Sequence, residues 1–375
     1  MILVFVFICL LLNSCSEKVE SDHIIHSDAI QNSKACTNLA DLFDVEFIPL
    51  ETLDESLLGR SVGKVVKKNG QFYISCDRKY ILVFDHAGKY LFQINKQGGG
   101  PGEYTNLSDF DVTEEGDIVV LNSSKIIKYD PSGNMIASFD IDITGFNLSI
   151  LDKDRMLVCA SGEDYLLYAI DTQGHVLSKD LYNKGKTSMG KNIAFNYLPK
   201  QGFMYQYEFT NTFMIYDKTR NSFNEQCLIP VEMNVINMSD DKRMRDRHGY
   251  DYYEKLPQTR LLGGVSMYSD YLLFSIGSNS DGFSVYIADN VKNNSWIISD
   301  KTKSDIGSLS PFVLLNNVNK CISDDCFVTY IAVDQLVEEL ELGHQFLNEP
   351  LTSYFNRIEK PEEENPVLIL LKIKK

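Results

Sequence analysis

The stretch Gly98-Gly99-Gly100-Pro101-Gly102-Glu103-Tyr104 decides the fold of this chain. Its four glycines and one proline exclude the interior of a helix or a strand, because glycine weakens both and proline lacks a donor N–H. Strand-like runs flank it, one ending near Asn95 and the next starting near Ser108. We therefore expect a structural loop from the outer edge of one β-sheet to the inner edge of the next, with Tyr104 packed between the sheets.

A glycine-rich loop can also bind phosphate, but that function requires the N-terminus of a following helix. The next run, residues 110–121, has the pattern of a strand, a turn and a second strand. We therefore prefer the structural interpretation of this loop.

Turn chemistry reveals a repeat on both sides of the loop. Asp85, Asp130 and Asp171 each end an apolar strand, lie 45 and 41 residues apart, and precede a glycine by three positions. Such an Asp accepts backbone N–H bonds and such a Gly accepts a positive φ, which is typical of a tight turn. We interpret the three aspartates as turn formers and not as catalytic acids.

A unit of about forty residues with several short strands is the sequence signature of a propeller blade. Six units follow one another, with strands within residues 62–94, 110–139, 148–177, 203–221, 264–298 and 312–374. The last unit is one strand short, while residues 43–50 form a strand without a partner before the first unit. Pairing that strand beside the C-terminal one closes the ring and removes exposed edges. The expected fold is therefore all-β, a six-bladed β-propeller over residues 41–375 that is closed by an N-terminal strand in the last blade.

Two partly helical insertions interrupt the repeat, at residues 234–260 and 334–364. The first combines rigid aromatic side chains with forked donors, a composition typical of interaction hot spots. An equally good interpretation is a loop that packs its tyrosines on the ring and solvates its charges. The candidate ligand-binding residues are Arg243, Arg245, Arg247, His248, Tyr250, Tyr252 and Tyr253.

The chain begins with an apolar run, residues 1–12, that is too short to span a bilayer and has the length of a signal-peptide core. Leu12-Asn13-Ser14-Cys15 resembles a bacterial lipobox, although no Lys or Arg precedes the run. We expect a lipoprotein signal peptide over residues 1–14, an acylated Cys15, and a flexible tether over residues 15–40. A short buried strand is the weaker alternative.

Composition excludes some partners. The net charge of −16 disfavours nucleic acids and anionic membrane surfaces, so the acyl anchor remains the expected membrane link. The cysteines after Cys15 are scattered, and no Cys/His spacing indicates a metal site or a cofactor. Cys321 and Cys326 are close enough in sequence to bridge a hairpin, but buried free thiols are favoured.

Several ordered motifs resemble the six-bladed β-propeller lipoproteins of Bacteroidota, which are distantly similar to NHL-repeat propellers. These motifs are Phe-Asp-Val-Glu-Phe-Ile-Pro-Leu-Glu at 43–51, Val-Phe-Asp-x-x-Gly-Lys-Tyr-Leu at 83–91, the glycine-rich loop at 98–104, and Asn-Pro-Val-Leu-x-x-x-Lys at 365–372. The resemblance implies a lipid-anchored protein of the Gram-negative cell envelope, at the outer membrane. It implies no particular activity.

Two functions remain open. The favoured one is a binding module that presents its loops and central opening to a glycan, a peptide or a partner protein. The alternative is a metal-dependent lactonase or lyase, with Ca²⁺ as the metal and its ligands on the inner strands. Those strands offer Asp111 and Asp152 but no histidine, so we predict no catalytic residues. Carboxylates from three blades meeting on the axis would favour the enzyme.

Overall fold

The computed structural model describes part of the chain, and every structural statement below concerns that part. The described residues are 32–59, 61–160, 162–182, 196–198, 202–206, 212–217, 222–227, 259–261, 266–278, 282–289, 291–299, 301–302, 315, 317–341 and 353–374.

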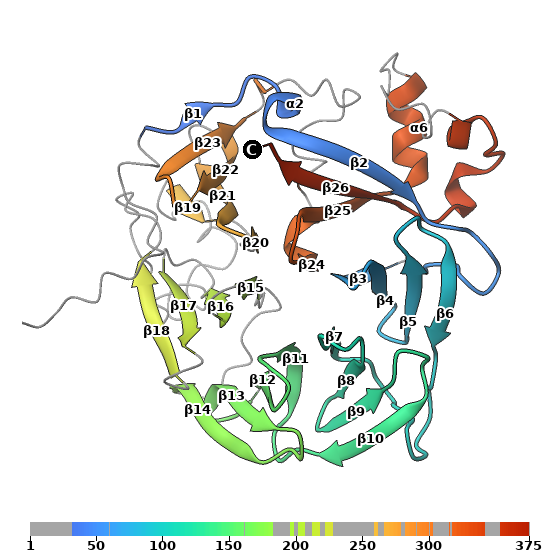
Figure 1. Ribbon diagram of the computed structural model, residues 1–375, viewed down its shortest axis with the longest axis vertical. Coiled ribbons are helices and arrows are strands. Elements are labelled where there is room, and N and C mark those ends of the chain that lie inside the picture. The colour runs from blue at the N-terminus through green and yellow to red at the C-terminus, as the bar shows by residue number, and fades with distance from the viewer. Residues whose placement is uncertain are drawn as a thin grey trace, which may run out of the picture.

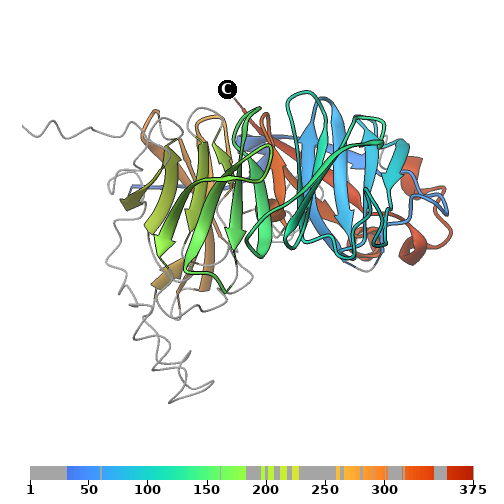
Figure 2. The same cartoon turned by 90° about the horizontal axis from the view of Figure 1, so that it is seen from below.

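The described strands form sheets that stand around a central axis, as in a β-propeller (Figure 1). Seen from the side, the strands run across the thickness of a flat ring (Figure 2). The glycine-rich loop lies between sheets one and two in the chain, and sheet three follows. Sheet one contains β24 (Cys321–Ser323), β3 (Val62–Lys68), β4 (Gln71–Cys76), β5 (Tyr80–Asp85) and β6 (Tyr90–Ile94). Sheet two contains β7 (Asp109–Val112), β8 (Ile118–Asn122), β9 (Lys125–Tyr129) and β10 (Met135–Asp140). Sheet three contains β11 (Gly145–Ile150), β12 (Arg155–Ala160), β13 (Tyr165–Asp171) and β14 (Val176–Tyr182).

Three more sheets complete the arrangement. Sheet four contains β15 (Asn196–Leu198), β16 (Gly202–Gln206), β17 (Thr212–Asp217) and β18 (Ser222–Cys227). Sheet five contains β1 (Lys34–Ala35), β23 (Asn294–Ile298), β22 (Gly282–Asp289), β21 (Tyr271–Ser278), β19 (Thr259–Leu261) and β20 (Ser266–Tyr268). Sheet six contains β2 (Phe43–Pro49), β26 (Val367–Ile373) and β25 (Phe327–Ile331).

The described helical elements are few and short. They are α2 (Leu39–Leu42), η1 (Val318–Lys320), α6 (Val333–Glu341) and η2 (Pro361–Glu363). Helix α6 lies on the outer side of sheet six, as Figure 1 shows. It overlaps the insertion predicted to be partly helical, at residues 334–364. No helix in the described part of the chain combines the length and apolar composition that crossing a bilayer requires.

The predicted count of six complete blades needs correction. Five sheets have four or more strands, whereas sheet six has three. The short β24, which leads into β25, pairs in parallel with β3 of sheet one, from Cys321↔Val65 to Ser323↔Lys67. The inner strands of neighbouring blades come closest near the axis, so a short strand there can pair across the blade boundary.

The expected partner of the N-terminal strand is present. Strand β2 pairs antiparallel with β26 along its whole length, from Phe43↔Ile373 to Pro49↔Val367. The backbone N–H of Ile373 also donates a 2.6 Å hydrogen bond to the hydroxyl of Tyr268, which links sheet six to sheet five.

Side-chain alternation explains how the sheets pack. Successive residues of a strand point to opposite faces. On β5, Ile81 and Val83 pack in the apolar cluster shared with sheet two, whereas Leu82 and Phe84 pack in the cluster shared with sheet six. Both faces are therefore buried, which is why the middle strands read as nearly continuous apolar runs.

The turn interpretation of the repeated aspartates is confirmed. One Asp85 carboxylate oxygen accepts the backbone N–H of Ala87 and of Lys89, both at 2.9 Å, and Gly88 has a φ of +82°. Asp130 and Asp171 accept backbone N–H groups in the same way.

The glycine-rich loop connects β6 to β7, and Tyr104 lies between sheets one and two. The Tyr104 ring is fully buried in their shared cluster, and its hydroxyl donates to the carbonyl of Ile94 at 3.0 Å. Burial raises the pKa of Tyr104 to about 12, so this phenol stays protonated at physiological pH. Gly102 adopts a φ of +72°, and its carbonyl accepts the hydroxyl of Tyr129.

Candidate functional site

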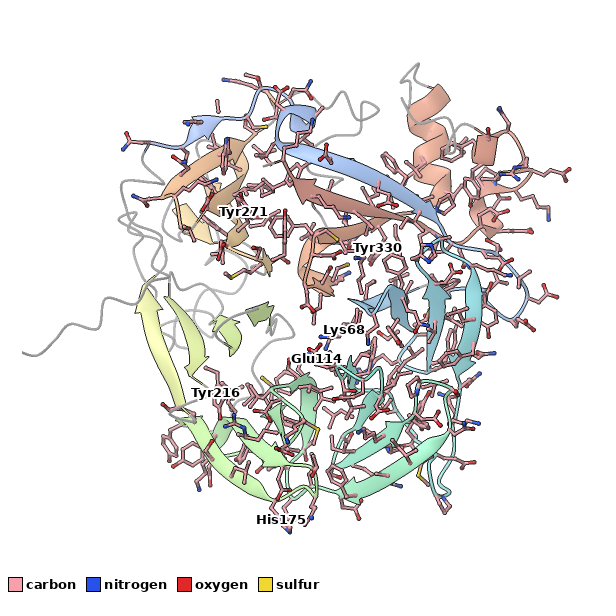
Figure 3. The ribbon with its side chains drawn as sticks, viewed as in Figure 1. Lys68, Glu114, His175, Tyr216, Tyr271 and Tyr330 are labelled. Atoms are coloured by element: carbon pink, nitrogen blue, oxygen red, sulfur yellow. The ribbon has the colours of Figure 1, made fainter. Side chains whose placement is uncertain are left out.

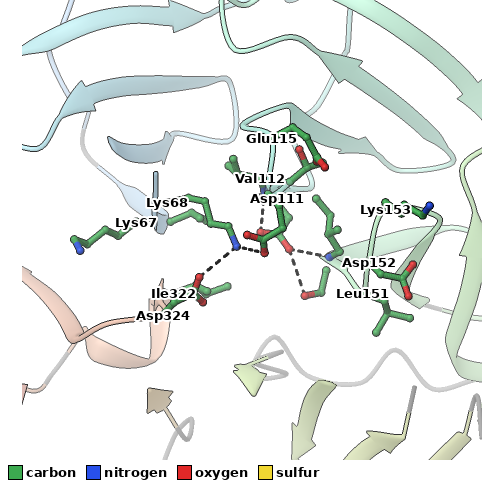
Figure 4. A pocket seen from close by; sticks show the side chains of 15 residues that line it. Lys67, Lys68, Asp111, Val112, Glu115, Leu151, Asp152, Lys153, Ile322 and Asp324 are labelled. Atoms are coloured by element: carbon green, nitrogen blue, oxygen red, sulfur yellow. Dashed lines mark hydrogen bonds and ion pairs between the residues drawn. The ribbon is translucent and has the colours of Figure 1, made fainter. Parts of the chain in front are cut away.

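A hollow of about 250 Å³ opens where the ends of the inner strands β3, β7 and β11 meet β24 (Figure 4). We call it the axial hollow, because Lys68 and Glu114 lie beside each other near the centre of the ring (Figure 3). Its lining residues come from three ring positions and from the turns that follow these strands. They are Val66, Lys67, Lys68, Asp111, Val112, Thr113, Glu114, Glu115, Ser149, Ile150, Leu151, Asp152, Lys153, Ile322 and Asp324.

Lys68 connects three segments at the hollow. Its ammonium group contacts Glu114 Oε1 at 2.6 Å and Asp324 Oδ2 at 3.3 Å, and only 12% of its side chain is exposed. Burial by itself would lower the pKa of Lys68, but the hydrogen bond that Lys68 donates to Glu114 and the charge of Asp324 outweigh burial and raise it. The lysine therefore stays charged and holds the two carboxylates in place.

The neighbouring lysine makes a second link to the β24 turn. Lys67 Nζ contacts both carboxylate oxygens of Asp325 at 2.6 Å, and Ser323 Oγ donates to one of them at 2.7 Å. Burial favours the neutral acid, but the bonds from Lys67 and Ser323 lower the pKa of Asp325 below its ordinary value. This carboxylate is therefore ionised at neutral pH.

Two buried carboxylates join β7 to β11, and one of them, Asp111, lines the hollow. Asp109 accepts the backbone N–H of Leu148, and Asp111 accepts that of Ile150, each at 2.8 Å. Burial raises the pKa of Asp111, although the charge of Lys64 and the N–H bonds from Ile150 and Val112 oppose the shift. Inner strands from two different sheets are thus connected by side chains.

Lys64 supports the same region from β3. Its ammonium group donates to the carbonyls of Phe110 at 2.7 Å and Leu148 at 3.1 Å, and it contacts Asp109 at 3.4 Å. The ammonium group of Lys64 therefore contacts groups on the inner strands of sheets one, two and three, and its side chain is 15% exposed.

The third side of the hollow is formed by the turn after β11. Asp152 accepts two hydrogen bonds from the Arg155 guanidinium, at 2.9 and 2.7 Å. These bonds fix the orientation of its carboxylate. Lys153 is 80% exposed at the same turn. Glu115 is exposed on the turn after β7. The rim thus presents exposed charges of both signs, among them the ammonium group of Lys153 and the carboxylate of Glu115.

The lining offers charges of both signs beside apolar side chains such as Val66, Val112 and Ile322. Carboxylates from three ring positions, Asp111, Asp152 and Asp324, share this hollow. Each already has a donor: backbone N–H for Asp111, Arg155 for Asp152 and Lys68 for Asp324. Among the residues that the structure describes, no group of three or more His, Cys, Asp or Glu side chains could hold a metal ion.

The sequence identified part of this site. It placed Asp111 and Asp152 on inner strands, and the structure brings both to the axial hollow. It missed Lys68, Glu114 and Asp324. The sequence did show charged residues at the ends of inner strands. It did not show which of these charges pair, because pairing depends on which blades are neighbours.

The other candidate residues are placed as follows. The candidate ligand-binding residues of the first insertion lie outside the described residues, as does Cys15; they are Arg243, Arg245, Arg247, His248, Tyr250, Tyr252 and Tyr253. Cys321 and Cys326 are both buried with free thiols, so the favoured interpretation of this pair is confirmed.

Several solved structures resemble this fold to different degrees. A Bacteroides fragilis protein described as a putative exported protein matches 92% of this chain over 99% of its own length, with 19% identity and a TM-score of 0.71. BamB from Moraxella catarrhalis matches 70% of this chain over 69% of its own length, with 12% identity and a TM-score of 0.39. PorZ is a surface component of the type IX secretion system of Porphyromonas gingivalis. It matches 67% of this chain over 31% of its own length, with 13% identity and a TM-score of 0.37. The first match shows a shared fold, whereas the TM-scores of the other two are too low to support an argument.

No curated protein sequence matches the chain. The sequence profile of a family described as a domain of unknown function, DUF4934, matches residues 23–372. Because this match covers nearly all of the propeller together with the residues from 23 that precede it, the chain belongs to the DUF4934 family.

Proposed function

We propose that this protein is a binding module of the bacterial cell envelope and that its ligand occupies the axial hollow. One observation carries the proposal: fixed charges of both signs stand beside apolar side chains in a concave site built from neighbouring blades. Such a mixture is typical of ligand pockets. It suits a short peptide, which has an amine, a carboxylate and apolar side chains, better than a neutral glycan.

Equilibrium dialysis of the full chain against tripeptides with free termini, and against uncharged oligosaccharides, tests the ligand class. We expect retention of charged tripeptides. Lys153→Ala and Glu115→Ala should weaken that retention without changing the melting temperature, because both side chains are exposed at the rim. The matched controls are Lys372→Ala and Glu338→Ala, which remove exposed charges away from the hollow. Equal retention of oligosaccharides, or unchanged binding in both rim variants, would contradict the proposal.

A metal-dependent lactonase or lyase is the second candidate, because carboxylates from three ring positions share the hollow. The arrangement does not fit a Ca²⁺ site, since N–H or ammonium donors already contact these carboxylates and would repel a cation. Titration with CaCl₂ tests this candidate. A raised melting temperature that Asp111→Asn and Asp324→Asn both abolish would support the enzyme over the binding module.

The proposed location is the outer membrane, through a signal peptide at residues 1–14, an acylated Cys15 and a tether. The similar fold of an exported Bacteroides fragilis protein supports an envelope location. Cys15→Ala should release the protein into the soluble periplasmic fraction. Mass spectrometry that finds an intact, unmodified segment 1–15 on the mature protein would contradict this proposal.

We also propose that sheet six is a sixth blade and that β2 closes the ring. The full-length pairing of β2 with β26 supports closure, because β26 would otherwise present an unpaired edge. The insertion with Arg245, Tyr252 and Tyr253 is proposed as an additional binding surface, and replacing all three by Ala should weaken ligand capture at little cost in stability.

A further inference from the structure

A second hollow, of about 680 Å³, lies between the connection from β2 to β3 and the segment from Arg357 through η2. We call it the outer groove; it shares no lining residue with the axial hollow. One wall is formed by residues 52–54 and 57–59 with Tyr80, and the other by Arg357, Glu359, Lys360, Glu362, Glu363 and Glu364.

The first wall presents apolar side chains to solvent. Leu53 and Leu57 are 41% and 42% exposed, although most of the leucines whose burial the structure describes are buried. Leu58 and Tyr80 are partly buried beside them and pack against the core shared by sheets six and one. Such leucines on a groove wall would lose water contact if a partner covered them.

Hydrogen bonds hold this wall in shape. The Asn365 amide nitrogen donates to the carbonyls of Glu51 at 2.9 Å and Ser56 at 2.8 Å, and its oxygen accepts the N–H of Leu58 at 2.8 Å. Asn365 is itself 1% exposed. Tyr80 also donates to the carbonyl of Leu57 at 3.2 Å. A partner would thus meet a preformed surface and would not have to order it.

The opposite wall carries most of the charge. The carboxylates that line the groove are Asp54, Glu359, Glu362, Glu363 and Glu364, whereas its cations are Arg357 and Lys360. Lys360 already pairs with Glu363 at 2.6 Å, which neutralises one carboxylate. The groove is therefore acidic next to exposed leucines, and its complement is a basic partner with large apolar side chains.

We propose that the outer groove binds an extended polypeptide segment in which Lys or Arg residues flank one or two large apolar residues. The apolar residues pack on Leu53 and Leu57, and the basic residues pair with Glu362 and its neighbours. This interaction surface is separate from the ligand site proposed at the axis.

Fluorescence anisotropy of the full chain with three labelled peptides tests the proposal. The peptides are Lys-Lys-Leu-Phe-Lys-Lys, Glu-Glu-Leu-Phe-Glu-Glu and Lys-Lys-Ser-Ser-Lys-Lys. We expect the first to bind most tightly, and its affinity to fall as the ionic strength rises from roughly 0.05 to 0.5 M. Glu359→Gln with Glu362→Gln should weaken it by roughly threefold or more, and Leu57→Ser by about tenfold.

Matched controls replace equivalent side chains elsewhere. Ile136→Ser removes another exposed apolar side chain, 51% exposed on β10, and Asp142→Asn with Glu338→Gln removes two exposed charges. Equal binding of the acidic peptide, or equal losses in groove and control variants, would overturn the proposal. Loss of binding only in Lys153→Ala and Glu115→Ala would also overturn it, since the peptide would then occupy the axial hollow. Concentration-dependent self-association that Leu57→Ser abolishes, without peptide binding, would assign the groove to a second copy of this chain instead.

Discussion

The carboxylate of Asp109 on β7 accepts a 2.8 Å hydrogen bond from the backbone N–H of Leu148 on β11, a strand of the next sheet. Asp111, two residues further, makes the same bond to Ile150. Sheets two and three have separate backbone ladders, so their inner strands need side chains to satisfy the N–H groups that face the next sheet. These two aspartates perform that function between sheets two and three.

Asp109→Ala should lower the free energy of unfolding by about 3 kcal/mol, because it leaves the Leu148 N–H and the partly buried Lys64 ammonium group without a carboxylate. Urea unfolding followed by fluorescence measures the change. Asp142→Ala removes an exposed carboxylate and serves as the control. Equal midpoints for the two variants would mean that the link between blades contributes little.

Asp111 should make stability depend on pH in a defined direction. Burial raises its pKa in the folded state, so its contribution is fully present below the unfolded value of about 4 and is lost as the pH rises through the folded pKa. Asp111→Asn cannot ionise, so its stability relative to wild type should improve steadily from acid to neutral pH. Unfolding midpoints across that pH range give the difference.

Asp130 provides a control of opposite sign for that experiment. Hydrogen bonds from Asn134 lower its pKa, so its contribution is present above the unfolded pKa and is lost in acid. The free energy of unfolding of Asp130→Asn, relative to that of wild type, should therefore be highest at low pH. The same trend in both variants would contradict the burial argument for Asp111.

Tyr104→Phe should cost about 1–2 kcal/mol, because it leaves the buried carbonyl of Ile94 without the hydroxyl that donates to it. Tyr104→Ala should cost about 3–5 kcal/mol, since it leaves a cavity between sheets one and two. Calorimetry gives both values. Tyr182→Phe, at a position that is 67% exposed, should leave the melting temperature unchanged.

Gly88→Ala and Gly70→Ala distinguish backbone strain from a clash with the N-terminal strand. Gly70 has a φ of +72° and open space where a Cβ would lie, so alanine there should cost about 1 kcal/mol. Gly88 has a φ of +82°, but a Cβ would lie 2.2 Å from the backbone oxygen of Pro49 on β2. Alanine at Gly88 should therefore cost roughly 2 kcal/mol more. Equal thermal shifts would show that β2 does not press on this turn.

Removing residues up to Leu50 tests closure of the ring. The truncated chain lacks β2, so β26 should present an unpaired edge and the protein should aggregate or become sensitive to proteases. Size-exclusion chromatography and limited proteolysis measure these outcomes. A truncated chain that stays monomeric with an unchanged melting temperature would count against closure.

The local features of this protein were predictable because each depends on neighbouring residues. The Asp85 turn, the Tyr104 loop and the strand that pairs with β26 all agree with the structure. Each follows from alternation, from turn residues, or from the need to cover a sheet edge. The incomplete sheet six was not predictable, because the preference of β24 for β3 depends on how closely two blades approach.

The sequence by itself determined the strands, the turns and the order of the blades, because these depend on side-chain periodicity and on residues close together in the chain. Only the tertiary structure decided which charges form the axial hollow. Lys68 lies 46 residues from Glu114 and 256 residues from Asp324, and no local pattern links the three. They meet because the ring places the ends of separate inner strands side by side, which brings opposite charges from distant parts of the chain within contact distance.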